Sequence, residues 1–308
     1  MKRIIKKAFC IFLCAFVIAA SITMGAFAKN NEPQSKYTYV FVHGLCGWGQ
    51  DDGAYELFPY WGMTTGNIFA ELERNGYNCV AADVGAVSSA WDRACELYAQ
   101  LVGTRVDYGA AHSAEHNHAR YGKTFDKPIV EKWDSANKVN FVAHSFGGVT
   151  VRLLIQLLAE GSEEEIAATD ASELSPLFKG GMADRVYSVT TLASPHNGSS
   201  FFEALGRFSN TVTTALGAMA YLCATTPLKH FFDPMLEQFN FIYNPNVKPE
   251  KLLDKAALKR FVNSEDNAFY DLTIDGAAKL NEKIKIQPDI LFLVSKQYNN
   301  TEQMDGEL

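Results

Sequence analysis

The chain has 308 residues, of which 47% are hydrophobic and 20% are charged, and its formal net charge at pH 7 is −7. This composition predicts a globular protein with a sizeable core, most of it in one large domain. The acidic balance argues against nucleic acid as a partner, because nucleic-acid binding depends on Lys and Arg contacts to phosphates.

Residues 1–28 are predicted to be a secretory signal peptide. Four basic residues lie within residues 1–7, an apolar stretch follows over 8–20, and Ala26–Phe27–Ala28 forms a small-x-small cleavage site. An uncleaved membrane anchor is the alternative, although the apolar stretch is short for a membrane span. Cleavage after Ala28 would leave 24 basic against 35 acidic residues. We therefore expect a secreted, extracellular protein whose mature domain covers residues 29–308.

Strand-like and helical segments alternate along this domain. Runs of β-branched and aromatic residues predict strands over 37–42, 79–83, 139–143, 186–192 and 290–294. Apolar residues at helical spacing predict helices over 67–75, 91–102, 149–161 and 252–261, with a loop over 103–122. The alternation predicts an α/β fold with a mostly parallel central sheet flanked by helices. An unusually apolar segment over 201–230 fits either a helical lid or an ordinary buried helix.

The segment around Ser145 is typical of a nucleophile elbow. The strand-like run ending at Ala143 leads into His144–Ser145–Phe146–Gly147–Gly148, and a helical pattern follows. A serine on such a sharp strand-to-helix turn projects its hydroxyl into a cleft, and small neighbours allow the strand and helix to approach. Ser145 is therefore the candidate nucleophile of an acyl-transfer reaction. The alternative is a buried serine that caps the helix.

A second glycine-containing turn follows the first predicted strand, at His43–Gly44–Leu45–Cys46–Gly47–Trp48. An α/β-hydrolase fold carries its oxyanion loop at this place. The backbone N–H groups of Leu45 and Phe146 would then converge on the developing alkoxide. The alternative is a tight glycine turn with a packing tryptophan.

Three histidines, His112, His116 and His118, lie close in sequence to Asp92 and Asp107. Neutral imidazole and carboxylate groups suit Zn²⁺, and a closed set of four protein ligands would make the site structural. Solvated histidines in an exposed loop are the alternative. A catalytic zinc hydrolase is also conceivable, but the sequence contains no His-Glu-x-x-His element.

Several long strings carry a resemblance to a known family: residues 91–96 (WDRACE), 106–112 (VDYGAAH), 116–120 (HNHAR), 174–178 (LSPLF) and 270–272 (YDL). Over roughly residues 38–300, the chain resembles the secreted true lipases of the thermophilic-bacillus and staphylococcal group. The resemblance implies an α/β-hydrolase fold with a zinc-bearing insertion and a helical lid over residues 201–230. It also implies hydrolysis of triacylglycerols and simpler esters at the lipid–water interface.

Site residues are carried over from this resemblance position by position. Ser145 would be the nucleophile, and Leu45 and Phe146 would supply the oxyanion N–H groups. A structural zinc would be held by Asp92, His112, His118 and Asp266, whereas His116 matches a position that is not a ligand.

The family's catalytic Asp and His, its calcium-binding residues and its last strand or strands correspond to positions beyond Leu308. The chain as given therefore lacks the expected acid and base, and His196 and His230 are the histidines that follow Ser145. The chain is therefore expected to be a fragment of a complete lipase. A secreted lipase-like module that binds lipid without turnover is the alternative function, and an enzyme whose base is supplied by another chain is a further alternative.

The four cysteines outside the first 28 residues, Cys46, Cys79, Cys95 and Cys223, are widely spaced. An extracellular location would permit disulfides, but these cysteines are expected to be small core residues.

Overall fold

The computed structural model describes residues 36–63, 66–208, 210–241 and 255–295. The predicted signal peptide lies outside these residues. A five-stranded sheet in the order β2-β1-β5-β6-β7 forms the centre of the fold. Its strands are β1 (Thr38–Val42), β2 (Cys79–Ala82), β5 (Val139–His144), β6 (Val186–Leu192) and β7 (Leu291–Ser295). All neighbouring pairs are parallel, so the predicted parallel sheet is confirmed.

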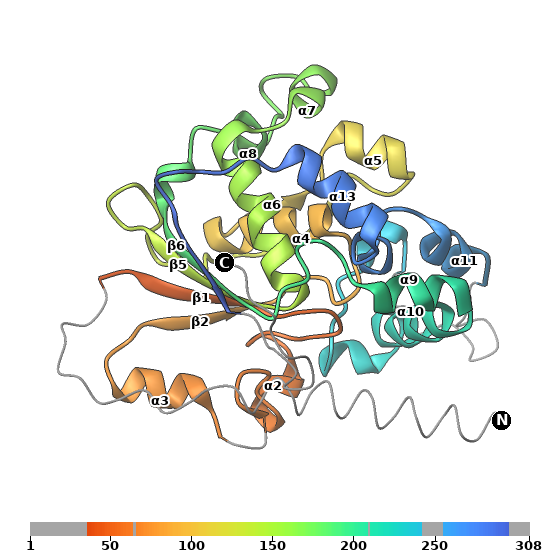
Figure 1. Cartoon of the computed structure of the whole chain (residues 1–308), viewed down its shortest axis with the longest axis horizontal. Helices are drawn as coiled ribbons and strands as arrows, with labels where there is room; N and C mark the ends of the chain where they lie inside the picture. Colours follow the sequence, from red (N-terminus) through yellow and green to blue (C-terminus); the bar gives the residue numbers. More distant parts are fainter. Residues whose placement is uncertain (1–35, 64–65, 209, 242–254, 296–308) are drawn as a thin grey trace, which may run out of the picture.

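Helices cover both faces of this sheet (Figure 1). On one face lie α4 (Ala90–Val102) and α6 (Phe146–Glu160), and on the other lie α2 (Gly53–Leu57) and α3 (Ile68–Arg74). Side chains of β1 alternate between the faces. Val40 and Val42 belong to the large core cluster that includes α4 and α6, whereas Phe41 packs with Trp61 and Phe69. Burial on both faces explains why the central strands read as almost continuous apolar runs.

The segment predicted as a loop over residues 103–122 is instead folded, which corrects the sequence prediction. Strand β3 (Arg105–Asp107) pairs antiparallel with β4 (Tyr121–Thr124), and helix α5 (Ala110–His116) lies between them in the chain. Strands of three and four residues are too short to show a period. They are held by tertiary contacts, including a bidentate ion pair between Arg120 and Asp107 at 2.9 Å.

The segment predicted as a lid or buried helix forms two helices, α9 (Ser200–Phe208) and α10 (Asn210–Thr225). Both predicted environments occur on α10, because Ala220, Tyr221 and Ala224 are buried while Met219 and Leu222 are exposed. Figure 1 places α9 and α10 beside α11 (Lys255–Asn263), away from the sheet. Residues 252–254, where the sequence analysis expected α11 to begin, lie outside the described residues.

Shorter elements complete the described part of the chain: α7 (Glu163–Ala168), α8 (Pro176–Lys179), η2 (Ala183–Arg185), η3 (Pro227–His230), η4 (Glu237–Phe239), α12 (Ala268–Asp271) and α13 (Ile274–Lys283). Cys79 and Cys95 are buried, Cys46 and Cys223 are half-buried, and all four are free. Within the described ranges, no helix has the length and apolar character needed to cross a membrane.

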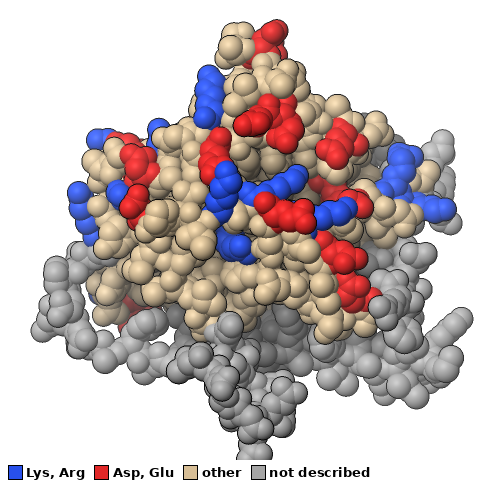
Figure 2. Space-filling model, turned by 45° about the horizontal axis from the view of Figure 1, so that its top comes forward, with Lys and Arg blue, Asp and Glu red and all other residues tan. Residues whose placement is uncertain are grey.

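Two surface features are evident. On the face shown in Figure 2, Lys and Arg side chains lie among Asp and Glu side chains. Ion pairs of the protein include Lys285–Glu160 and Lys279–Glu265. Strand β7 lies at the edge of the sheet, and all five of its residues are exposed. Strand β7 therefore presents a continuous run of apolar side chains, Leu291 to Val294, to solvent.

Candidate active site and metal centre

Ser145 lies at the turn between β5 and α6, in a backbone conformation that is rare for a residue with a side chain. Its φ is 54° and its ψ is −124°. The surrounding structure must hold such a conformation in place, and strained residues of this kind cluster at functional sites. The Ser145 N–H donates to the Leu192 carbonyl on β6 at 2.8 Å, and the Ser145 carbonyl accepts from the Gly148 N–H at 3.1 Å.

The turn is tight because α6 begins directly against the sheet. A Cβ atom on Gly147 would lie 2.4 Å from the Val42 carbonyl oxygen, and one on Gly148 would lie 2.1 Å from the Ser194 hydroxyl oxygen. Ala143, on the preceding strand, is completely buried. These positions therefore require small residues, as the spacing around Ser145 predicted.

The loop at residues 43–48 lies directly on this serine. A Cβ atom on Gly44 would be 2.8 Å from Ser145 Cβ and 3.3 Å from Ser145 Oγ. Leu45 follows at once, and Phe146 is the first residue of α6, so its N–H has no acceptor within the helix. Within the described residues, neither of these two N–H groups donates a hydrogen bond. Both are thus available to an oxygen atom bound next to Ser145.

Tyr60 joins the loop to the elbow. Its hydroxyl accepts the Gly44 N–H at 3.1 Å and lies 2.6 Å from His144 Nδ1. Burial lowers the pKa of His144 to about 4, so the imidazole is neutral at pH 7. The Tyr60 hydroxyl therefore connects Gly44 to the residue before Ser145.

Arg93 holds the same region from inside the core. It is completely buried, and its guanidinium donates to the carbonyls of His43 and Gly85 and to the Thr150 hydroxyl. Three segments are thereby tied together: the end of β1, the turn after β2 and helix α6. Neither Tyr60 nor Arg93 could be identified from sequence, because Tyr60 contacts His144 and Arg93 contacts His43 and Thr150 across long stretches of chain.

The two histidines that follow Ser145 in sequence lie in other surroundings. His196 Nε2 is 3.3 Å from the Thr191 hydroxyl, and His230 lines a pocket with Asp52, Asp83 and Asp233. Within the described ranges, no hydrogen bond joins the Ser145 hydroxyl to a histidine.

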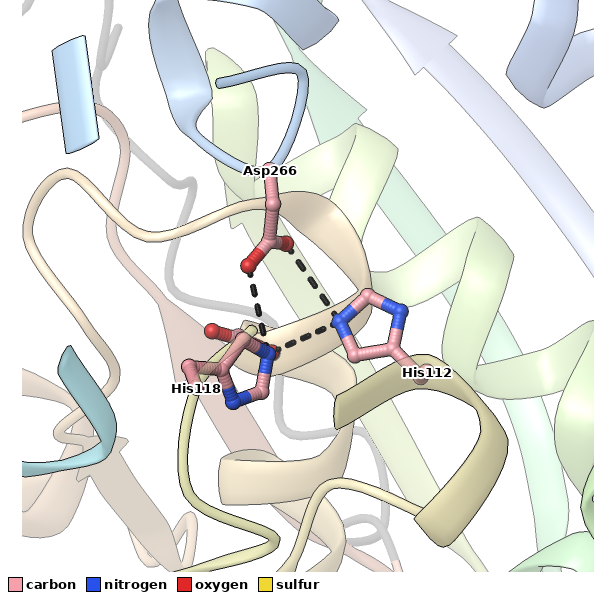
Figure 3. Close-up of side chains that lie close together, drawn as sticks. His112, His118 and Asp266 are labelled. Carbon is pink, nitrogen blue, oxygen red and sulfur yellow. Dashed lines mark hydrogen bonds and ion pairs between the residues drawn. The ribbon is translucent and has the colours of Figure 1, made fainter. Parts of the chain in front are cut away.

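The fold brings together the four predicted metal ligands, Asp92, His112, His118 and Asp266. Asp92 lies in the first turn of α4, His112 on α5, His118 just after α5, and Asp266 just before α12. One potential ligand atom from each lies within 4.8 Å of all the others. Figure 3 shows both imidazole rings directed at the Asp266 carboxylate. This group, called the metal centre below, could hold a metal ion.

The separations between these atoms fit a small tetrahedral ion. His112 Nε2 lies 3.2 Å from Asp92 Oδ1 and 3.4 Å from Asp266 Oδ1, and His118 Nε2 lies 3.3 Å from Asp266 Oδ2. Ligands placed about 2.0 Å from a tetrahedral ion are separated from one another by about 3.3 Å. His118 Nε2 and Asp92 Oδ1 lie farther apart, at 3.9 Å.

The hydrogen bonding of His118 also points to a cation. Its Nδ1 lies 2.9 Å from the Ala119 carbonyl oxygen, which can only accept, so Nδ1 carries the proton. In the neutral ring, the lone pair of Nε2 then faces the Asp266 carboxylate. His118 Nε2 and both Asp266 oxygens are buried without a well-formed hydrogen bond to any described residue. A cation between them would satisfy all three atoms.

Charge effects within the group agree with this geometry. Burial lowers the pKa of His112, but the carboxylates of Asp266 and Asp92 outweigh that effect and raise it to about 10. Burial alone would raise the pKa of Asp266, but the two histidines hold it below its usual range. Both pKa shifts therefore reflect attraction between the imidazoles and the carboxylates of this group.

Asp107 and His116, which lie close in sequence to His112, have other contacts. Asp107 forms the ion pair with Arg120, and the His116 ring lies 4.6 Å from the His112 ring but outside the group of ligand atoms. Gln238, which the sequence analysis did not identify, donates to Asp92 Oδ2 at 2.8 Å and is completely buried. It leaves Asp92 Oδ1 directed at the histidines.

Comparisons with known proteins agree with this architecture. The family described as "Lipase-like, C-terminal domain" matches residues 35–305. The chain belongs to this family. It is 42% identical over 268 residues to lipase 2 of Staphylococcus aureus and 38% identical over 269 residues to lipase 1 of that species. These alignments cover 86% of the chain and 38% and 39% of the two relatives, so the chain spans less than half of their length.

Solved structures show the same fold. Staphylococcus hyicus lipase matches with a TM-score of 0.74 at 35% identity, over 86% of this chain and 67% of that one. EstA from Clostridium botulinum matches with a TM-score of 0.71 at 35% identity, over 88% of this chain and 61% of that one. The predicted resemblance to bacterial lipases and the α/β fold are thereby confirmed, and the chain is a member of a lipase and esterase family.

Proposed function

We propose that this chain is the nucleophile-bearing part of a secreted carboxylic ester hydrolase of the triacylglycerol lipase type. The observation that carries the proposal is the strained conformation of Ser145 directly beneath the loop at residues 43–48. In this proposal, the Ser145 hydroxyl attacks the ester carbonyl carbon and its proton passes to a histidine base. Collapse of the tetrahedral intermediate expels the alcohol and leaves an acyl-enzyme, which water then hydrolyses.

The oxyanion of that intermediate would be stabilised by the backbone N–H groups of Leu45 and Phe146. Support comes from their position on either side of Ser145 and from the lack of another acceptor within the described residues. Tyr60 and Arg93 would keep the loop rigid, so little reorganisation is needed as charge develops. One donor of this type contributes on the order of 10²–10³ in kcat.

The base and its carboxylate partner are proposed to lie outside the described residues. Neither His196 nor His230 hydrogen-bonds the Ser145 hydroxyl, and the curated relatives are longer than this chain. We therefore assign no residue of the described ranges to either role. The family's calcium site is likewise not assigned to any described residue.

The metal centre is proposed to hold a structural Zn²⁺, with Asp92, His112, His118 and Asp266 as its ligands. Imidazole and carboxylate ligands at these separations suit zinc, whereas calcium prefers oxygen ligands at longer distances. The ion would supply a cross-link between α4, α5 and the segment before α12. Since the protein would provide all four ligands, the role is structural.

Secretion and action at a lipid–water interface are also proposed. The first rests on the signal-peptide pattern of residues 1–28. The second rests on the names of the relatives and on exposed apolar side chains of the α9–α10 pair, including Phe201, Met219 and Leu222. In this proposal the α9–α10 pair is the lid that the resemblance implied.

The test is turnover of p-nitrophenyl butyrate and of a triacylglycerol emulsion by the protein secreted from its own source. Ser145→Ala should lower kcat by about 10³-fold or more, because the nucleophile is removed. Undiminished turnover in that variant would refute the assignment of Ser145. Binding to lipid vesicles without any Ser145-dependent turnover would instead favour the lipid-binding module.

A further inference from the structure

Helix α5, which carries His112, cannot hold itself in place. It has seven residues, and the residue before it is Gly109, whose φ is 94° and which has no side chain to cap the helix. Isolated helices of this length are unstable in water. Their first N–H groups also need acceptors from outside the helix. The position of His112 therefore depends on contacts from other elements.

Glu165, on helix α7, supplies two such contacts. Its Oε1 accepts the N–H of His112 at 2.8 Å, and its Oε2 accepts the N–H of Ala111 at 3.0 Å. The side chain is only 1% exposed, so solvent competes little for these bonds. Hydrogen bonds to a carboxylate are stronger than those between neutral groups. Glu165 thus fixes the backbone of His112 itself.

The surroundings of Glu165 fit this contact. A Cβ atom on Gly109 would lie 2.3 Å from the Glu165 carboxyl carbon, so a side chain at residue 109 would displace the carboxylate. Ser162 caps α7 by accepting the Glu165 N–H at 3.3 Å. The Ser162 cap therefore fixes the start of the helix that carries Glu165, and the missing side chain at Gly109 leaves space for the Glu165 carboxylate.

The His112 ring is fixed separately from its backbone. It stacks on Trp91 with ring centroids 5.0 Å apart and an interplanar angle of 20°. Trp91 is anchored in turn by donation from its Nε1 to the Tyr108 carbonyl at 2.8 Å. With the ring plane set by Trp91 and the backbone set by Glu165, His112 Nε2 is directed at Asp92 and Asp266.

We propose that Glu165 is a positioning residue of the metal centre, which holds His112 ready to bind the ion without touching the ion itself. This inference rests on the proposed metal centre. Metal ligands that are already oriented bind more tightly, and loss of an orienting contact typically lowers metal affinity about 10–100-fold. Glu165 acts on the ligand's main chain, whereas Gln238 acts on a ligand's side chain.

Glu165→Gln is the decisive variant, because it keeps the size of the side chain but replaces one acceptor oxygen by a donor NH₂ group. Glu163→Gln is its matched control, since Glu163 lies on the same helix and is exposed. The dissociation constant for Zn²⁺ is measured on the full-length protein by competition with a chromophoric chelator. We expect it to rise about 10–100-fold in Glu165→Gln and to stay within twofold of wild type in Glu163→Gln.

A spectroscopic readout separates positioning from general destabilisation. With Co²⁺ bound in place of Zn²⁺, the visible absorption bands report the geometry of the ligands. Glu165→Gln should change their intensity or position while the melting temperature of the metal-free protein stays close to that of the Glu163→Gln control. A changed melting temperature with an unchanged Co²⁺ spectrum and Zn²⁺ affinity would overturn the proposal.

The binding measurements distinguish the absence of a metal centre from the absence of a role for Glu165. Wild-type protein that binds no Zn²⁺ would remove the metal centre and the role of Glu165 with it. Tight binding by wild type and equally tight binding by Glu165→Gln would refute the role of Glu165 alone. If Glu165→Gln does not fold, Glu165→Asp is tested instead, because it keeps the negative charge on a shorter side chain. It must then bind Zn²⁺ at least tenfold more weakly than Glu163→Asp for the proposal to stand.

Discussion

Adding one methyl group at Gly44 is the sharpest test of the proposed oxyanion loop. The new Cβ atom of Gly44→Ala would lie 2.8 Å from Ser145 Cβ, 3.1 Å from the His144 carbonyl oxygen and 3.3 Å from Ser145 Oγ. Carbon atoms in contact are normally about 3.5–4.0 Å apart. The loop must therefore move by about 1 Å, and the Leu45 N–H moves with it.

The expected loss follows from that displacement. A misplacement of about 1 Å in a catalytic arrangement can cost on the order of 10²-fold in rate, and loss of one oxyanion donor costs 10²–10³ in kcat. We expect kcat for p-nitrophenyl butyrate to fall by about 10²-fold, with KM changed by less than about threefold because the acyl-binding surface is untouched.

The assay is steady-state kinetics on the full-length protein, with thermal unfolding measured in parallel. Ser145→Ala gives the baseline without the nucleophile. A Gly44→Ala variant that keeps more than a third of wild-type kcat would refute the reasoning, since the methyl group would then fit beside Ser145 without displacing the donor. A loss confined to KM would assign the loop to substrate binding instead.

Three further predictions concern the metal centre, a buried acidic pocket and the edge of the sheet. His118→Ala should lower the zinc content found by elemental analysis and the melting temperature, because bound metal at 1,000 times its Kd adds about 4 kcal/mol to stability; equal zinc in both proteins would contradict the assignment. Burial and the charges of Asp83 and Asp233 raise the pKa of Asp52 to about 8. The contribution of protonated Asp52 to the free energy of unfolding is therefore fully present below about pH 4 and is lost as the pH rises to about 8. Asp52→Asn should therefore become progressively more stable relative to wild type in denaturant unfolding as the pH rises from about 4 to about 8, and a gain that matches the exposed control Asp126→Asn would reject this prediction. Leu293, 49% exposed on β7, should promote self-association of residues 29–308 expressed alone; light scattering should show less association in Leu293→Lys, and a monodisperse wild-type protein would count against this.

The main features of the sheet and of the elbow could be predicted from sequence. Strand β6 was predicted with the bounds that the structure shows, and the other sheet strands within one residue at each end. These features depend on local patterns: apolar runs for strands buried on both faces, and small residues wherever a helix begins against the sheet. The turn at Ser145 follows from residues that adjoin it in the chain.

The complete set of metal ligands could not be predicted from local sequence patterns. The clustered histidines suggested a metal, but the choice of Asp266 came from the resemblance to known lipases and not from spacing. The strands and helix within residues 103–122 were not predicted, because strands of three or four residues are too short to show an alternating pattern of apolar and polar residues. An unpaired sheet edge was expected from the resemblance and not from the apolar pattern of residues 290–294, since the exposure of β7 depends on the neighbours a strand has in space.

By itself, then, the sequence determined where the sheet strands lie along the chain, the elbow and the small residues beside Ser145, because each depends on neighbours along the chain. The tertiary structure alone decided that Tyr60 fastens Gly44, that Arg93 joins three segments and that Gln238 and Glu165 hold the metal ligands. Each of these contacts joins residues that are remote in sequence. A hydrogen bond of that kind leaves no periodic pattern, and only the packing of helices against the sheet brings its donor and acceptor together.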